Sequence, residues 1–425
     1  MGYLELLRTQ RKFRRLWLGQ VVSELGDWLQ MIALLLLFPT KGASAMLLSG
    51  VFIVRMLPSI VWAPLAGVLA DRYPRGRVMV ACDLGRALIV LGYLLVRGPE
   101  DVIWIYLLMF AQESLTTFFE PARAAALPQV VEPRALLAAN SLAGATWSAM
   151  LAIGATLGGL IASFGGPRAA FLADAASFLL SALLIGSIGV PRVKRDAASE
   201  AAHAADRFGL YALREGARYL RGHAAQASAA MVKGLWGLCG GIVFLFSIYA
   251  GEIFATQGAD PARSTGLLYA GRGLGALIGP LIARRIWGES ARGLRLSILA
   301  GFPLSALGYL ALSTCPSAAF GAGCLVLAHS GGSTCWVSST QLIQMTVPND
   351  LQGRVFAVEQ AAFTLTVAMS NALVGAAIGE AILGARGATV AMACAAAVAA
   401  GIWGMAMRRL GPRLDAAAAA ASRAS

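Results

Sequence analysis

The sequence has little charge and few polar stretches. Asp, Glu, Lys and Arg together make up 13% of its 425 residues, whereas hydrophobic residues make up 58%. A soluble domain carries about 25% charged residues, and a protein interior in water does not need so much apolar sequence. The composition therefore excludes a water-soluble globular protein and indicates that lipid is the solvent of most of the chain.

Residues that enzymes and metal sites need are also scarce. The three histidines, His203, His223 and His329, are scattered, and the sequence has neither a metal-ligand cluster nor a G-x-S-x-G elbow. It has no Walker loop to bind phosphates, so ATP is not the energy source. The six cysteines lack C-x-x-C spacing. We therefore expect no metal, no cofactor and no enzymatic activity.

Long apolar runs are what the sequence has instead. Twelve can be read, each near the ~20 residues that cross a bilayer as a helix. They cover residues 16–38, 46–70, 78–96, 102–121, 136–163, 169–190, 230–252, 264–286, 294–313, 316–341, 355–381 and 388–408. The sequence thus predicts an all-α membrane protein with twelve transmembrane helices.

Cationic residues are distributed unevenly over the loops that join these runs. With both termini in the cytoplasm, 26 Lys and Arg residues fall in the inner loops and tails, and five fall in the outer loops. This asymmetry follows the positive-inside rule. The net charge of +13 is therefore explained by orientation in a lipid bilayer, and it gives no reason to expect a nucleic-acid partner.

One long polar stretch divides the runs into six and six. We expect an N-terminal half, a cytoplasmic linker, a C-terminal half and a disordered alanine-rich tail, at residues 1–190, 191–229, 230–410 and 411–425. The halves echo each other, because Pro128 and Arg134 recur 220 residues later as Pro348 and Arg354. We therefore predict two pseudo-symmetric halves, as transporters commonly have.

Polar residues inside three of the runs are spaced so that each set shares one helical face. The sets are Gln20, Ser23, Glu24, Asp27 and Gln30 in the first run, Glu113, Thr116, Thr117 and Glu120 in the fourth, and Ser330, Ser333, Thr334 and Gln341 in the tenth. A charged side chain at the bilayer centre costs about 2.5–3.5 kcal/mol unless it faces water or a partner. We expect these residues to line a water-accessible cavity.

Four charged groups, Glu24, Asp27, Arg55 and Glu113, fall near mid-membrane when depth is counted at ~1.5 Å per residue. Asp27 and Arg55 are level on adjacent helices, which predicts an ion pair between them. Glu24 or Glu113 is then left to bind and release a proton, which predicts proton coupling. The alternative is that all four groups have purely structural partners.

A short basic turn joins the second and third runs, and it reads Gly67-Val-Leu-Ala-Asp71-Arg72-Tyr-Pro-Arg75-Gly-Arg77. It resembles the G-x-L-A-D-R-x-G-R-[KR] signature of the major facilitator superfamily, with Pro74 at a glycine position and Gly76 at a basic one. The resemblance implies the fold of that superfamily, in which helices 1, 4, 7 and 10 line a central cavity.

The same resemblance implies a cytoplasmic gate. Gly67 permits close helix approach, and Asp71 caps the N-terminus of a neighbouring helix, where the dipole favours an anion. Glu120, at the inner end of the fourth run, is expected to meet one of three bases, namely Arg72, Arg75 or Arg77.

Two further segments resemble exporters of this superfamily. In the fifth run, Gly154-Ala-Thr-Leu-Gly158-Gly159 is similar to the G-P-x-x-G-G motif of its antiporters, with Ala155 in place of proline. The opening segment 13–28 and Asp83-Leu-Gly-Arg86-Ala resemble the branch that includes macrolide efflux pumps and siderophore exporters. Asp83 and Arg86 also lie three residues apart in one helix, where we expect them to pair.

These features predict a proton-coupled exporter that exchanges protons for amphipathic small molecules, such as drugs, macrolides or siderophores, by alternating access. We expect a monomer in a bacterial inner membrane, with both termini cytoplasmic. The first alternative is an importer or lysophospholipid-type carrier of the same fold. A membrane sensor or a membrane enzyme is an alternative from another class.

Overall fold

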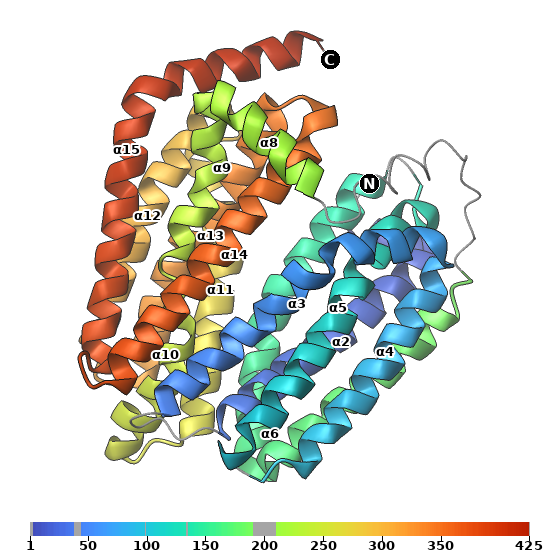
Figure 1. The fold of residues 1–425 in the computed structure, drawn as a ribbon, viewed down its shortest axis with the longest axis vertical. Coiled ribbons are helices and arrows are strands. Elements are labelled where there is room, and N and C mark those ends of the chain that lie inside the picture. The colour runs from blue at the N-terminus through green and yellow to red at the C-terminus, as the bar shows by residue number, and fades with distance from the viewer. Residues whose placement is uncertain (1–2, 38–43, 98, 133–134, 190–209, 425) are drawn as a thin grey trace. The chain divides into compact units, whose positions relative to one another are not determined.

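The computed structural model describes residues 3–37, 44–97, 99–132, 135–189 and 210–424, apart from the side chains of some positions within helices. Helices are the only regular secondary structure in that part of the chain (Figure 1). The chain forms two compact units. Unit 1 comprises Met1–Pro39, Ile53–Gly209 and Asp260–Gly266, and unit 2 comprises Thr40–Phe52, Leu210–Ala259 and Leu267–Ser425.

The helices that precede residue 190 correspond to the first six predicted runs. They are α1 (Tyr3–Thr9), α2 (Arg11–Leu35), α3 (Ser44–Arg72), α4 (Arg75–Gly92), η1 (Tyr93–Leu95), η2 (Pro99–Asp101), α5 (Val102–Val130) and α6 (Leu136–Gly186). The long α6 contains two of the runs. Gly166, with φ of 71°, adopts a conformation that glycine tolerates best, and it separates the two segments just before Pro167.

The helices that follow residue 209 correspond to the linker and the last six runs. They are α8 (Leu210–Gly222), α9 (Ala224–Gly237), α10 (Ile242–Ile248), η4 (Tyr249–Phe254), η5 (Ala255–Gln257), α11 (Pro261–Trp287), α12 (Ala291–Ser313), α13 (Ala318–Thr346), α14 (Asn349–Gly379) and α15 (Ala385–Ala424). The seventh run is thus divided into α9, α10 and η4. Its α9 begins at residue 224, six residues before the predicted boundary.

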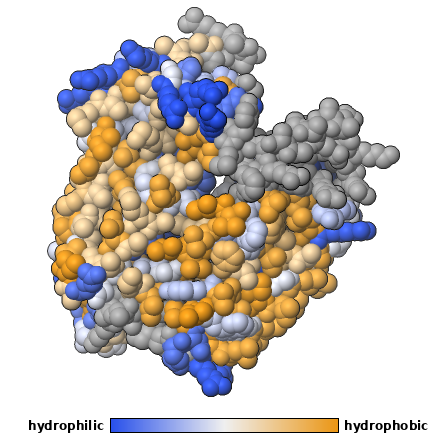
Figure 2. All heavy atoms as spheres, in the orientation of Figure 1, coloured by the Kyte–Doolittle hydropathy of each residue, from blue (hydrophilic) through white to orange (hydrophobic). Residues whose placement is uncertain are grey.

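Eight helical stretches of the described chain are long and apolar enough to cross a membrane, and the stretch Ala138–Gly186 covers most of the fifth and sixth predicted runs. The remaining runs, the first, second and tenth, coincide with α2, α3 and α13. Apolar side chains are exposed on the outside of the membrane-length helices. Leu88 of α4, Ile103 of α5 and Leu183 of α6 are each 72% exposed. Figure 2 shows hydrophobic residues over most of the visible surface. Surfaces of this kind are stable in contact with lipid.

The break between α9 and α10 is stabilised by a side chain of α14. Residues 239–241 read Cys-Gly-Gly, and the backbone N–H of Gly241 donates to Ser370 Oγ at 3.0 Å. The Ser370 hydroxyl in turn donates to the carbonyl of Leu238 at 2.7 Å. Backbone groups freed inside a membrane need such partners, so Ser370 allows the seventh run to break.

The C-terminal tail differs from the prediction. Residues 411–425 were expected to be disordered, but α15 continues as a helix to Ala424. Alanine has the highest intrinsic helix propensity, and this segment is anchored to unit 2 as well. Asp415 forms an ion pair with Arg295 of α12, and Leu414 is fully buried.

Three glycines spaced four residues apart bring α11 directly against the backbone of α13 in unit 2. A Cβ atom at Gly271, Gly275 or Gly279 would overlap a carbonyl oxygen of α13, and these oxygens belong to Ala322, Val326 and Ser330. Small residues at this spacing let membrane helices approach closely, which maximises van der Waals contact.

Replacement of the central glycine is therefore expected to destabilise unit 2. The variant Gly275→Ala forces the two helices apart, and overpacking of this kind costs about 1–3 kcal/mol. The matched control is Gly323→Ala in α13, because a Cβ atom there meets no atom within 4 Å. Thermal unfolding of the purified protein in detergent should show a lower Tm for Gly275→Ala and no loss for Gly323→Ala.

Candidate functional site

The predicted mid-membrane charges of unit 1 are brought together, but one of the predicted pairings is wrong. Arg55 of α3 forms its ion pair with Glu113 of α5, with Nε and Oε1 2.7 Å apart, and not with Asp27. Asp27 of α2 forms no ion pair among the described residues and interacts electrostatically with both Arg86 and Arg55. Depth along each helix was a poor guide here, because it gives no information on which helix faces which.

Glu24 is at one end of a chain of polar contacts that links α2 and α5. Its Oε1 accepts a hydrogen bond from Gln20 Nε2 at 2.8 Å, while its Oε2 is buried and has no hydrogen-bond partner among the described residues. Gln20 Oε1 accepts from Arg123 Nη1 at 3.2 Å, and Arg123 forms an ion pair of 2.6 Å with Glu120. Half of the Glu120 side chain (51%) is exposed. These contacts therefore connect the half-buried Glu24 with the exposed carboxyl group of Glu120.

The other predicted residues of these two stripes are held by hydrogen bonds within or between helices. Gln30 exchanges two hydrogen bonds of 2.7 Å with Gln112 of α5, an amide pair that the sequence patterns did not reveal. The hydroxyls of Ser23, Thr116 and Thr117 donate to backbone carbonyls of their own helices. Such hydroxyls are satisfied internally, which is the ordinary state of Ser and Thr in membrane helices.

A second buried cluster of charges lies where α2, α4 and the second segment of α6 meet. Asp83 and Arg86 of α4 form the ion pair that their spacing predicts, and this prediction is confirmed. Asp83 also accepts from Ser181 Oγ at 2.7 Å. The guanidinium group of Arg86 lies between the rings of Phe119 and Phe178, with centroids at 4.5 and 4.4 Å.

Asp174 of α6 belongs to this second cluster and was missed at the level of sequence. It is fully buried and interacts with Asp27 and Arg86. It is also the single charged residue of the predicted run 169–190. That isolation was the available signal, because an ionisable residue inside a membrane helix is a candidate functional residue by default.

Unit 2 contains a buried ion pair that was also missed. Lys233 Nζ of α9 lies 2.8 Å from Glu359 Oε2 of α14, and both residues are almost fully buried. The ammonium group lies 4.4 Å from the centroid of the Trp336 ring. Trp336 packs edge-on against Phe363 with centroids 5.0 Å apart, and Trp236 stacks on the same phenyl ring. This arrangement places an ion pair beside an aromatic cluster of α9, α13 and α14.

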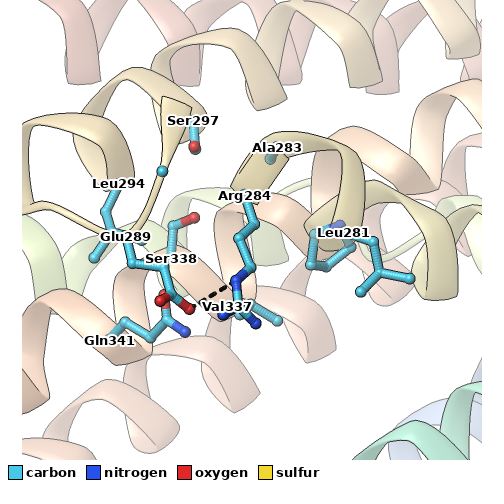
Figure 3. A pocket seen from close by; sticks show the side chains of 11 residues that line it. Leu281, Ala283, Arg284, Glu289, Leu294, Ser297, Val337, Ser338 and Gln341 are labelled. Atoms are coloured by element: carbon cyan, nitrogen blue, oxygen red, sulfur yellow. Dashed lines mark ion pairs between the residues drawn. The ribbon is translucent and has the colours of Figure 1, made fainter. Parts of the chain in front are cut away.

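The predicted polar stripe of the tenth run lies in α13 of unit 2. The Ser330 and Ser333 hydroxyls donate to carbonyls of the same helix, and Thr334 is buried. Gln341 lines a cavity of about 160 Å³ between α11, α12 and α13, near the exposed ion pair of Arg284 with Glu289 (Figure 3). Drug-sized ligands need pockets of about 300–1,000 Å³, so this cavity is too small for such a substrate.

The signature between α3 and α4 is described in part. The side chains of Asp71 and Arg72 and the surroundings of Gly67 lie outside the described part of the structure. Arg75 Nη1 donates to the carbonyl of Ala125 at 2.7 Å and so ties the start of α4 to α5, while Arg77 is exposed. Glu120 was expected to pair with a base of this turn. Its ion pair is with Arg123, which is one helical turn away on α5.

The glycines of the antiporter-like segment all serve close packing. Gly154 and Gly158 of α6 lie against the backbone of α2 at residues 25–29. Gly159 lies against Ala262 and Gly266, in the first turns of α11 that belong to unit 1. A larger residue at any of these positions would push the helices apart.

A family model decides what kind of protein carries these features. The model of the Major Facilitator Superfamily matches residues 16–358, which is well over half of the chain. The chain belongs to the Major Facilitator Superfamily. It is therefore a membrane-embedded transporter of small molecules and not an enzyme, as its relatives also are.

Relatives of this major facilitator protein include several that are named as exporters. The uncharacterized MFS-type transporter YfiS of Bacillus subtilis (strain 168) is 30% identical over 379 residues, 85% of each chain. The putative bacilysin exporter BacE of Bacillus amyloliquefaciens is 25% identical over 87% of this chain and 89% of its own length. Macrolide efflux protein A of Streptococcus pyogenes is 24% identical over 43% of this chain and 45% of its own length.

Solved structures of other transporters share the fold. A bacterial homologue of the iron transporter ferroportin, in an inward-facing state, matches with a TM-score of 0.68 at 16% identity, over 93% of this chain and 99% of the homologue. The POT family transporter PepTSo matches with a TM-score of 0.70 at 14% identity, over 95% and 98%. At these identities the likeness concerns the fold alone.

Proposed function

We propose that this major facilitator protein is a proton-coupled exporter, which moves amphipathic small molecules out of the bacterial cytoplasm in exchange for protons. The observation that carries the proposal is Glu24, a half-buried side chain whose Oε2 atom is buried without a hydrogen-bond partner and which forms no ion pair among the described residues. The relatives named as bacilysin and macrolide exporters support the outward direction. We place the protein in the inner membrane as a monomer, with both termini in the cytoplasm.

Of the two carboxyl groups that were candidates for proton exchange, Glu24 fits better than Glu113. The guanidinium of Arg55 lies 2.7 Å from the carboxylate of Glu113 and compensates its negative charge. Glu24 has only an amide donor, Gln20, at hydrogen-bond distance. The chain through Arg123 to the exposed Glu120 gives Glu24 an electrostatic connection with the water-exposed end of α5.

The exchange of proton for substrate follows from the need of an ionised carboxyl group, when it is kept from water, for a compensating partner. When Glu24 is ionised it needs a compensating donor or cation, and when it is protonated it does not. Substrate and proton can therefore compete for the same site, which makes the transporter an antiporter. A gradient of 100 mV supplies about 2.3 kcal/mol per proton, enough for roughly 50-fold accumulation of substrate at one proton per molecule.

We also propose that residues of the signature and of the adjoining end of α5 form a cytoplasmic gate. Arg75 fixes the start of α4 to Ala125 near the inner end of α5. The ion pair of Glu120 and Arg123 lies on the same end of α5. Contacts of this kind can hold the inner side closed and release it during alternating access, and Gly154, Gly158 and Gly159 supply the close helix packing for an antiport cycle.

Replacement of Glu24 by glutamine is expected to abolish gradient-driven transport. Inverted membrane vesicles from a strain that expresses the protein are energised with an imposed pH gradient, and the uptake of labelled erythromycin and bacilysin is measured. The wild type should accumulate at least one of these compounds by about tenfold or more, within the roughly 50-fold limit. Glu24→Gln should reach only equilibrium levels, with a rate that no longer depends on pH.

Glu100→Gln is the control, because Glu100 is exposed in η2 and lies outside the proposed machinery. Its transport should equal that of the wild type. Equal pH-driven uptake by Glu24→Gln and wild type would contradict the role of Glu24. Uptake by right-side-out vesicles instead of inverted ones would favour an importer or a lysophospholipid-type carrier.

A further inference from the structure

Asp174 is a carboxyl group that the proposed exchange at Glu24 does not use. It lies in the second segment of α6 with 0% of its surface exposed. Its Oδ1 accepts a hydrogen bond of 3.2 Å from Ser177 Oγ. Its Oδ2 is buried and has no hydrogen-bond partner in the described part of the chain. A neutral hydroxyl is weak compensation for an ionised carboxylate that is removed from water.

The carboxyl group of Asp174 is directed at α2, beside Asp27. A Cβ atom added to Gly26 would overlap Asp174 Oδ1 and Ser177 Oγ, so the side chains of α6 fill the space that glycine leaves on α2. Asp27 is the next residue of α2, and it interacts electrostatically with Asp174. The two carboxyl groups are therefore neighbours across the contact of α2 with α6.

Carboxylates outnumber cations around these two residues. Asp174 interacts with Asp27, Arg86 and Tyr93 of η1, and Asp27 interacts further with residues of α3, α4 and α5. The charged set consists of four carboxyl and two guanidinium groups, namely Asp27, Asp83, Glu113 and Asp174 with Arg55 and Arg86. With every carboxyl group ionised, these six groups would carry a net charge of −2.

The two arginines have partners that leave Asp174 without a cation of its own. Glu113 has Arg55 at 2.7 Å. Asp83 has both its oxygens engaged, one by Arg86 and the other by Ser181. Arg86 forms its ion pair with Asp83. It interacts with Asp174 only electrostatically, without an ion pair.

We propose that Asp174 binds and releases a proton, which it holds in common with Asp27 across the contact of α2 with α6. The O–H bond forms at Asp174 Oδ2, the oxygen without a hydrogen-bond partner among the described residues, and it breaks when the proton passes to water. Glu24 lies three residues before Asp27 on α2 and also interacts with it. The pair is thus a second proton site of the transporter, next to the exchanging carboxyl group. Its part in transport rests on the proposed function, whereas proton binding can be measured directly.

Infrared difference spectroscopy of the full-length protein in lipid nanodiscs tests the proposal. Spectra in acidic and alkaline buffer are compared in the carbonyl-stretch region of protonated carboxylic acids. The wild type should lose a carboxylic acid band when the buffer becomes alkaline, and Asp174→Asn should lack that band. Asp27→Asn should keep the band but change the pH at which it disappears, because its neighbour in the pair is removed.

Three results would overturn the proposal. In the first, the band is present unchanged in Asp174→Asn. In the second, the band vanishes in Asp27→Asn alone. In the third, the band persists at every pH, which marks a permanently protonated structural group. If Asp174→Asn does not fold, Ser177→Ala serves instead, because it removes only the hydrogen bond to Oδ1. That variant should shift the frequency of the band, and an unshifted band would assign it to another residue.

The inference and the proposed function fail in different measurements. Glu24→Gln should retain the infrared band of Asp174, since Glu24 is a separate carboxyl group. A band missing from the wild type contradicts proton binding at Asp174, even where Glu24-dependent export is observed. Export that does not respond to a pH gradient contradicts proton coupling, and it does so irrespective of the infrared spectra.

Discussion

Replacement of Arg86 by methionine is expected to destabilise the protein by about 3–5 kcal/mol, the usual cost of removing one partner from a buried ion pair. Arg86 is 2% exposed, it pairs with Asp83, and its guanidinium lies between two phenyl rings. Its loss leaves Asp83 buried without a cation. The free energy of unfolding, measured in mixed detergent micelles, should fall by this amount, and expression in the membrane should fall with it.

Three further variants define the reason for that loss. Arg86→Lys keeps the charge but lacks the planar group that lies between the rings, so its stability should be intermediate. Arg86→Met combined with Asp83→Asn should recover much of the loss, because no unpaired charge of the pair remains. Arg284→Met removes one partner of an exposed ion pair and should cost less than about 1 kcal/mol. Equal losses at positions 86 and 284 would contradict a burial effect.

The ion pair of unit 2 should show the same behaviour. Lys233→Met leaves the almost fully buried Glu359 without its partner, and we expect a loss of about 3–5 kcal/mol in the free energy of unfolding. The reason is again desolvation, because a carboxylate that cannot reach water loses its compensating charge. Unfolding in mixed micelles is the measurement. Glu359→Gln should give a smaller loss, since an amide carries no charge.

A double variant distinguishes the effect of the unpaired charge from the effect of the lost contact with Trp336. Lys233→Met with Glu359→Met replaces both charges by apolar groups of similar size, and stability should return to within about 1 kcal/mol of the wild type. The matched comparison is Arg354 of α14 with Glu215 of α8, a partly exposed pair at 2.7 Å. Arg354→Met should cost clearly less than Lys233→Met. A double variant as unstable as Lys233→Met would show that the aromatic contact with Trp336, rather than the missing charge, is decisive.

Many features of the fold could be predicted because lipid imposes strong rules on sequence. A span needs about 20 apolar residues with its backbone hydrogen bonds satisfied internally, so the runs coincide with the observed helices. The break in the seventh run was not foreseen. It depends on Ser370, which lies 129 residues from Gly241 in sequence and reaches it only in the folded protein. The helical tail was missed because its anchor, Arg295, is equally remote.

The candidate site could be predicted only in its composition. Helical periodicity identified Glu24, Asp27 and Glu113 as groups facing away from lipid, and the spacing of Asp83 and Arg86 identified a pair within one helix. The contacts between helices followed other rules. Which carboxylate meets Arg55 depends on the rotation of each helix about its axis, and a sequence pattern fixes the polar face but not its neighbour.

The sequence by itself determined that this protein lies in a membrane, that helices span it and that a few ionisable residues are kept away from lipid. Those properties depend on hydrophobicity and on helical periodicity, which are local. Only the tertiary structure decided that Arg55 pairs with Glu113, that Lys233 pairs with Glu359, and that Asp174 lies against α2 with a free oxygen. Pairing of charges is a property of distance in space, and chain segments far apart in sequence meet only when the helices pack.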